Sequence, residues 1–278
     1  MRGKGTDSMC CCENQFVLKR VEVEAGGAIF ARTRLMLGEV TMDAIASAKV
    51  AVFGLGGVGG WCAESLVRTG VRRLTLVDPD LVCASNINRQ LMATSSTVGR
   101  PKAEALAERL REINPDFVPD VRLLFYDAST AGEFDFSGFD YVVDAIDSLD
   151  SKVLLIRNAL ASPGTTLFSS MGAALRSDPF QVRRDEFRKV AGDGLARALR
   201  RRFRESGGIP DRRFTCVWSP ERREAAVRLA PDEPRVNGSL VHTTAVFGFA
   251  LASLVVEDVE RKAISDCRLR TRCASTSF

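Results

Sequence analysis

The sequence predicts an α/β fold built on a doubly wound, mostly parallel β-sheet, and three observations lead to this prediction. Short apolar runs that end in polar residues alternate with helical stretches along the chain. The first run, Val50 to Phe53, passes directly into a glycine-rich turn and then a helix. The second run, Leu74 to Val77, ends at Asp78. This alternation is typical of chains whose helices cover both faces of a parallel sheet.

Composition and length limit the class of protein. The chain has 278 residues, of which 45% are hydrophobic and 27% charged, and its net charge is +4, as in ordinary globular domains. We expect an N-terminal tail over 1–27, which shows no periodic pattern of apolar residues. One domain over 28–262 and a C-terminal tail over 263–278 are expected to follow. Both tails are predicted to be disordered. The eight cysteines follow no secreted disulfide pattern and no signal peptide is evident, which predicts a cytoplasmic protein.

The longest apolar stretch covers residues 240–256 and contains His242 and two threonines. A bilayer span needs about 20 mostly apolar residues. The stretch is therefore predicted to be a buried helix, and no membrane contact is expected.

The first elements precede the glycine turn. A segment from Phe30 to Gly38 leads into a helical stretch, Val40 to Ser47, which runs into the first strand. Arg32 and Arg34 lie in the first segment. They are either solvated helix charges or phosphate ligands, acting in their own subunit or in a second one, and the residues alone favour solvated charges.

The glycine turn predicts a nucleotide site. Gly54, Gly56 and Gly59 fit the pattern G-x-G-x-x-G, with Gly57 beside them, between a strand and a helix start. Glycines let the backbone approach a ligand closely, and the free amides of a helix N-terminus point at an anion. Asp78 follows Gly59 by 19 residues, about where a carboxylate binds a ribose hydroxyl. The fold is therefore expected to be Rossmann-like.

The segment after Asp78 is dense in hydrogen-bonding side chains. Asp80 follows at once, and Asn86, Arg89 and Gln90 on one turn could line a polyphosphate site. Lys102 opens a helix that runs to about Ile113. A lysine at a helix start is unfavourable for the helix dipole. A bound anion would relieve this, whereas solvent exposure would only make it tolerable, and Lys102 is a further phosphate candidate.

Three more strands are expected at Val121 to Phe125, Tyr141 to Ser148 and Thr165 to Ser169. The second of them ends in Asp144 and Asp147, and strand C-termini are where open α/β sheets bind ligands. Asp147 is the candidate for Mg²⁺, which prefers carboxylate and phosphate oxygens. Asp144 fits an internal role better.

Basic residues concentrate between 183 and 213, where helices are expected up to Glu205. The interpretation of this basic region stays open between a solvated face and a footprint for a nucleic-acid backbone. Its densest part contains Arg197, Arg200, Arg201, Arg202 and Arg204. A strand, Phe214 to Ser219, follows, and its Cys216 is more consistent with a core residue than with a reactive thiol.

Five motifs, taken together and in order, resemble the superfamily of ThiF, MoeB and ubiquitin-activating E1-like enzymes. They are Gly54-x-Gly56-Gly57-Val58-Gly59, Asp78-x-Asp80, Asn86-x-x-Arg89-Gln90, Lys102 and Asp144-Ala-Ile-Asp147-Ser148. Within the superfamily the chain is most similar to the tRNA threonylcarbamoyladenosine dehydratases. The similarity rests on Arg32-Thr-Arg-Leu-Met-Leu-Gly38, Val143-Asp-Ala-Ile-Asp-Ser148, the basic region, Cys216-Val-Trp-Ser and Gly238-Ser239.

The resemblance implies ATP and Mg²⁺ as cofactors and assigns roles. Asp78 would bind the ribose, Asn86, Arg89 and Lys102 the phosphates, and Asp147 the Mg²⁺ ion. Asp80, Gln90 and Asp144 would complete the nucleotide site. In a homodimer Arg32 would reach the partner's ATP, so the expected catalytic residues are Arg32, Arg89, Lys102 and Asp147.

The implied reaction is adenylation of the carboxylate of t6A37 in tRNA, followed by cyclisation to ct6A, with the basic region contacting the tRNA. The chain has no CxxC pair and no cysteine between Cys83 and Cys216, which disfavours thioester transfer. The alternatives are an E1-like activator of a ubiquitin-like sulfur carrier and a Rossmann protein that binds NAD or lacks catalysis. A sulfur-transfer or cysteine desulfurase system stays open as a partner.

Overall fold

The computed structural model describes residues 29–227 and 237–275, so the predicted N-terminal tail lies outside the described residues. Within these residues, five short 3-10 turns (η2 to η6) join the main elements. The strands are β1 (Lys49–Phe53), β2 (Arg73–Val77), β3 (Val118–Arg122), β4 (Tyr141–Asp144), β5 (Thr166–Ser170), β6 (Arg183–Glu186) and β7 (Thr215–Trp218). The helices are α1 (Ala31–Ser47), α2 (Gly59–Thr69), α3 (Lys102–Ile113), α4 (Leu149–Ala161), α5 (Gly194–Glu205) and α6 (Val241–Ser275).

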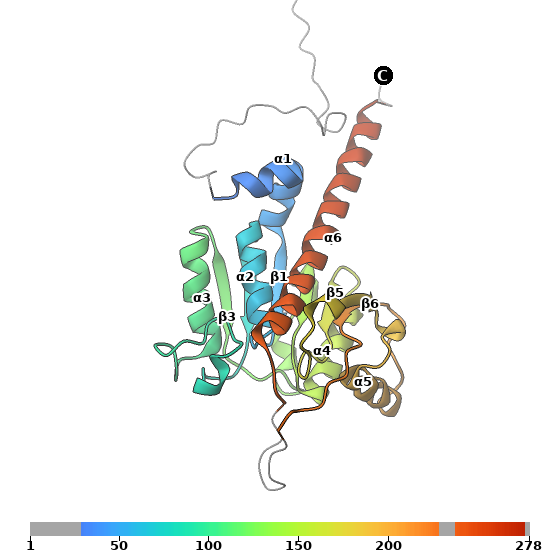
Figure 1. Cartoon of the computed structure of the whole chain (residues 1–278). Helices are drawn as coiled ribbons and strands as arrows, with labels where there is room; N and C mark the ends of the chain where they lie inside the picture. The colour runs from blue at the N-terminus through green and yellow to red at the C-terminus, as the bar shows by residue number, and fades with distance from the viewer. Residues whose placement is uncertain (1–28, 228–236, 276–278) are drawn as a thin grey trace, which may run out of the picture.

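The described strands form one seven-stranded sheet in the order β3-β2-β1-β4-β5-β7-β6 (Figure 1). Neighbouring strands are parallel except β6, which runs antiparallel to β7. The chain leaves β1 toward β2 and β3 and later returns to β4 on the other side of β1. The strand order therefore reverses between β1 and β4, and this is the place where such sheets bind ligands. The expected doubly wound, mostly parallel sheet is confirmed.

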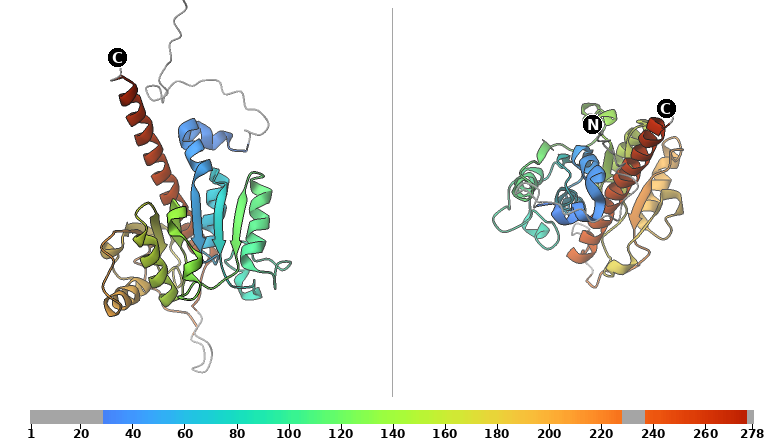
Figure 2. Two further views of the ribbon diagram at one scale, coloured as in Figure 1. Left: turned by 180° about the vertical axis from the view of Figure 1, so that it is seen from behind. Right: turned by 90° about the horizontal axis from the view of Figure 1, so that it is seen from above.

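Helices cover both faces of the sheet, as the view from above shows (Figure 2). Val50 and Val52 of β1 pack in one core with residues of α1, α2, α3 and α6. Ala51 and Phe53 belong to the other core, with residues of α4 and α5. Successive side chains of a strand point to opposite faces, so each strand of the sheet's centre contributes to both cores.

Helix α6 corrects the predicted C-terminal boundary. The tail expected from residue 263 continues α6 as far as Ser275. No glycine or proline follows Gly248, and Asp258 forms ion pairs with Arg261 and Lys262 one turn further on, which supports the helix. By length and composition, residues 241–269 could cross a bilayer, but their most apolar window is 50% buried where α6 packs on α1 and α2.

One predicted strand was wrong in position, and one predicted helical segment is a strand. The third strand is Val118–Arg122 rather than Val121 to Phe125, because Pro119 can occupy an edge strand. The residues 183–186, predicted as helix, form the edge strand β6. Backbone pairing with β7 outweighs their helical character, and four charged side chains suit an exposed edge. The helical part of the basic region is α5.

Candidate active site

A cavity of about 1060 Å³ lies at the C-terminal ends of the strands. One half of it is formed by the glycine turn after β1 and the segments after β2, with Lys102 at the start of α3. The other half is formed by the loop after β5, the start of α5 and residues 222–224. The loop after β4, with Asp147, contributes to the lining as well. The cavity therefore lies across the point where the strand order reverses.

The glycine turn has the close packing that its sequence predicts. Gly54 has φ of 83°, and a Cβ there would lie 2.7 Å from the carbonyl oxygen of Ala145. A Cβ on Gly59 would lie 1.8 Å from the carbonyl oxygen of Gly54. Gly54, Gly56 and Gly57 line the cavity, whereas Gly59 packs behind them at the first residue of α2. The turn thus brings backbone and a helix N-terminus to the cavity wall.

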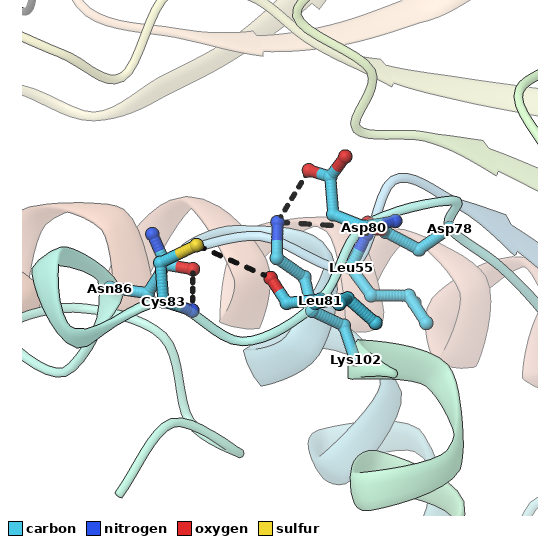
Figure 3. A network of polar contacts seen from close by, with 7 residues as sticks. All are labelled: Leu55, Asp78, Asp80, Leu81, Cys83, Asn86 and Lys102. Carbon is cyan, nitrogen blue, oxygen red and sulfur yellow. Dashed lines mark hydrogen bonds and ion pairs between the residues drawn. The ribbon is translucent and has the colours of Figure 1, made fainter. Parts of the chain in front are cut away.

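Asp78, Asp80 and Lys102 form a polar network in the half of the cavity that the glycine turn forms, called the nucleotide side after the sequence prediction (Figure 3). Asp78 accepts hydrogen bonds from the amides of Leu55 (2.6 Å) and Asp80 (2.9 Å). The Lys102 Nζ lies 2.7 Å from Asp80 Oδ2 and 4.0 Å from Asp78 Oδ1. Burial raises the pKa of the Asp78 carboxyl, against the opposing effects of Lys102 and the two amides. A buried carboxylate beside a buried ammonium group is arranged to bind hydroxyl and phosphate groups.

The three phosphate candidates on the turn that follows, Asn86, Arg89 and Gln90, differ in their position relative to the cavity. Asn86 lies outside the cavity, and its Oδ1 accepts from the amide of Cys83 (3.1 Å), so it holds the turn (Figure 3). Arg89 lines the cavity and donates to the Ser85 carbonyl. Gln90 also lines it, and its buried Oε1 has no hydrogen-bond partner among the described residues. The expected direct phosphate contact of Asn86 is therefore not supported within this chain.

Asp144 and Asp147 have different surroundings. Strand β4 ends at Asp144, so Asp147 lies in the loop beyond it and lines the cavity. Asp144 is fully buried behind that loop and pairs with the buried Lys152 at 2.8 Å. It also accepts from Ser169 Oγ (2.6 Å) and the Ile146 amide (3.2 Å). Asp144 thus has the internal role expected from the sequence, and its assignment to the cofactor-binding set is corrected.

A metal ion would need ligands beyond the protein. Among the described residues no group of three or more histidine, cysteine, aspartate or glutamate side chains could hold one. Asp147 is a single carboxylate on the cavity wall. This donor set fits an ion such as Mg²⁺ that arrives with a polyphosphate and takes one or two protein carboxylates.

Arg32 lies far from the cavity of its own chain. It is exposed on α1, and α1 leads into the start of β1 (Figure 1). The cavity lies at the other end of that strand. Nearby on α1, Leu35 and Met36 are 70% and 84% exposed. A contact of Arg32 with ATP in a second subunit stays a prediction.

The arginines of α5 have different environments. Arg197 lines the cavity. Arg200 turns inward: it donates to the carbonyls of Phe187 and Val190, and its guanidinium lies 5.1 Å from the centre of the Phe187 ring. Arg201, Arg202 and Arg204 are exposed, and Arg202 pairs with Asp150 at 2.6 Å. Arg200 is therefore corrected from a surface nucleic-acid contact to a residue that holds the loop before α5.

Sequence reasoning missed most of the second half of the cavity. Its residues follow β5 or come from distant loops, and they include Arg176, Asp193, Arg222 and Arg223. The Met171-Gly172-Ala-Ala segment after a strand end was the available signal. Cys216 is fully buried, and burial raises the pKa of its thiol well above the ordinary value. This confirms it as a core residue.

Comparison with known proteins shows the family of the chain. The sequence matches the ThiF family over residues 30–265. The chain belongs to the ThiF family. It is similar to the tRNA threonylcarbamoyladenosine dehydratase of Bacillus subtilis, with 33% identity over 252 residues, 85% of this chain and 98% of that protein. The ThiF match over residues 30–265 includes both halves of the cavity.

Solved structures agree with this family membership. The Escherichia coli tRNA N6-threonylcarbamoyladenosine dehydratase in complex with ATP has a TM-score of 0.78 and 34% identity, covering 87% of this chain and 98% of that one. The same enzyme has been solved with AMP. The molybdopterin-synthase adenylyltransferase of Escherichia coli matches a shorter stretch, at 33% identity over 176 residues, 63% of this ThiF-family chain and 65% of that protein.

Proposed function

We propose that this chain is an ATP-dependent tRNA threonylcarbamoyladenosine dehydratase, which adenylates the carboxylate of t6A37 in tRNA and cyclises the product to ct6A. The observation that carries the proposal is a two-sided cavity across the sheet's reversal point. One side offers a glycine turn, Asp78 and Lys102, and the other offers arginines. The likeness to dehydratases over nearly the whole domain supports the choice of substrate.

The chemistry needs activation, because a carboxylate would otherwise have to lose oxide. A carboxylate oxygen attacks the α-phosphorus of ATP, the bond from that phosphorus to the bridging oxygen breaks, and pyrophosphate leaves. A nitrogen or oxygen of the same side group then attacks the acyl carbon, loses its proton to solvent and expels AMP. The nucleoside has lost one water in total. No protein nucleophile takes part, in agreement with the buried Cys216.

The cavity residues act by binding and by charge. The glycine turn and the N-terminus of α2 face the phosphates, Asp78 holds the ribose hydroxyls, and Lys102 and Arg89 offset the charge that builds on the leaving pyrophosphate. Asp147 would hold the Mg²⁺ that accompanies ATP, which supplies further charge neutralisation. In an adenylating enzyme, removing one donor of this kind typically costs about 10²–10³ in rate.

A homodimer would complete the site. We infer that Arg32 acts on the ATP of a partner subunit, since it lies at the end of its own chain remote from the cavity. The exposed Leu35 and Met36 beside it support a subunit contact at α1. The exposed Arg201 and Arg204 are the residues of α5 that remain available for the tRNA backbone.

Incubation of the purified protein with ATP, Mg²⁺ and tRNA bearing t6A tests the proposal. AMP and ct6A should form in equal amounts, as measured by chromatography and by mass spectrometry of the nucleosides. Asp147→Asn should reduce AMP formation about 10²–10³-fold without changing the fold by circular dichroism. Absence of AMP with the wild-type protein, while a control dehydratase is active, would contradict the proposal.

A further inference from the structure

The second half of the cavity is strongly cationic. Its lining includes the four arginines Arg176, Arg197, Arg222 and Arg223, against the carboxylates Asp193 and Glu224. On the nucleotide side, two cations, Arg89 and Lys102, line the cavity with Asp78 and Asp80. The triphosphate has its glycine turn and lysine there, so the arginines opposite are suited to a different anion.

Arg176 differs from the other three because it is buried. Its side chain is only 10% exposed, whereas residues 222–224 and Arg197 are largely exposed. Its contacts are long: NH2 lies 3.4 Å from Asp193 Oδ2, and NH1 lies 3.3 Å from the Leu175 carbonyl. Its Nε has no hydrogen-bond partner in the part of the chain that the structure describes. A guanidinium carries five donors, and a buried donor without a partner costs about 1–3 kcal/mol, so this arrangement suits a ligand.

The loop that carries Arg176 is held from several sides. Leu175 has φ of 56°, in the left-handed region that is unfavourable for leucine, and its amide donates to the Gly238 carbonyl (2.9 Å). Glu221 accepts from the Ser177 hydroxyl (2.7 Å) and from two backbone amides. These hydrogen bonds lower the pKa of the Glu221 carboxyl, so it stays ionised. The position of Arg176 is therefore set before any ligand binds.

Asp193 gives the other fixed point. Asp193 is buried, and its carboxylate caps α5 by accepting a hydrogen bond from the Ala196 amide (2.8 Å). This hydrogen bond holds the carboxylate in place, so it does not move closer to Arg176. A Cβ on Gly172 would lie 3.3 Å from Asp193 Oδ2, which shows how closely the loop after β5 packs on this carboxylate. The guanidinium thus keeps spare donors beside the cavity.

We propose that Arg176 anchors the carboxylate of the substrate that is to be adenylated, here the threonyl carboxylate of t6A. This deepens the proposed function and rests on it. The planar guanidinium matches a carboxylate, so it can hold one oxygen while the other attacks the α-phosphorus. Adenylation removes the negative charge from the acyl group, and the contact weakens once the adenylate has formed. Arg176 therefore acts on binding of the substrate rather than on the leaving pyrophosphate.

The test compares two tRNAs that differ only in the carboxylate-bearing group: t6A-modified tRNA and the same unmodified transcript. Both contain the same phosphates, so their affinity ratio isolates the threonylcarbamoyl group, in which the carboxylate is the only charged part. The variants are Arg176→Gln and Arg176→Lys, with Arg111→Met, an exposed arginine of α3 remote from the cavity, as the matched control. Thermal unfolding and ATP affinity report on the integrity of each variant.

We expect Arg176→Gln to weaken binding of t6A-tRNA about 10- to 100-fold, with little change for the unmodified transcript and for ATP. KM for t6A-tRNA should rise more than kcat falls. Arg176→Lys keeps the charge but loses the planar fork, so it should fall between the glutamine variant and the wild type. If the glutamine variant does not fold, the lysine variant must still lower the affinity ratio severalfold.

Two results would overturn the anchor. Equal weakening for both tRNAs would make Arg176 a contact to backbone phosphate, and unchanged binding of t6A-tRNA in a folded variant would remove it from the site. Failure of the proposed function is distinguishable from both. In that case the wild-type protein would form no AMP, even if it bound t6A-tRNA more tightly than the unmodified transcript and lost that preference on substitution of Arg176.

Discussion

Replacement of Lys152 by methionine removes one member of the fully buried ion pair behind the Asp147 loop. Lys152 Nζ lies 2.8 Å from Asp144 Oδ2 and donates to the Ile146 carbonyl at 3.0 Å. Both side chains are 0% exposed. In Lys152→Met, Asp144 would remain as a buried carboxylate without its counterion, and the Ile146 carbonyl would lose a donor.

The structure indicates the size of the effect. Breaking a buried ion pair by removing one partner typically costs about 3–5 kcal/mol of the free energy of unfolding. Asp144 keeps the donors of Ser169 and Ile146, so the lower end, about 3 kcal/mol, is expected. In a chain of this size that corresponds to a fall in Tm of roughly 6–12 °C. The double variant Lys152→Met/Asp144→Asn removes both charges and should recover at least about half of the loss.

Urea unfolding followed by circular dichroism measures these differences, and ATP–pyrophosphate exchange shows whether the Asp147 loop is still in place. The control is Arg184→Met, which breaks an ion pair with Glu257 whose members are both 53% exposed, and which should cost less than about 1 kcal/mol. Equal losses in the single and double variants, or a loss below about 1 kcal/mol in Lys152→Met, would refute the reasoning that an unpaired buried charge dominates.

Three further predictions concern the two sides of the site. Lys102→Met should lower ATP–pyrophosphate exchange about 10²–10³-fold and also lower the thermal stability, measured by calorimetry. Adding Asp80→Asn to this variant should restore part of the thermal stability but none of the exchange. Arg201→Glu/Arg204→Glu should weaken tRNA binding and flatten its salt dependence, and unchanged filter-binding isotherms would remove this patch from the tRNA contact. Because burial raises the pKa of Asp78, ATP affinity should begin to fall on acidification at a higher pH than for an ordinary aspartate, as titration calorimetry with ATP checks. Ionisation of Asp78 itself disfavours folding as the pH rises through that pKa, as scanning calorimetry at a series of pH values checks. Asp78→Asn should lose both pH dependences.

The sequence by itself determined the main-chain plan of the nucleotide side. The glycine turn lies between β1 and α2, Asp78 follows β2, and Lys102 opens α3, as local patterns of apolar runs and glycines predicted. These features depend on neighbours in the chain: which residues can turn, which can start a helix and which end a strand. For the same reason the family could be identified from motifs that are each only a few residues long.

Only the tertiary structure decided where side chains point and which distant segments meet. Asn86 and Arg89 are three residues apart, yet the first holds a turn and the second lines the cavity. Arg200 faces inward to two carbonyls while Arg201 is exposed. Arg176 gains its significance from Asp193 and from burial under loops far away in sequence. Direction and burial depend on the packing of segments that no local pattern brings together, so the cationic half of the site could not be read from the chain alone.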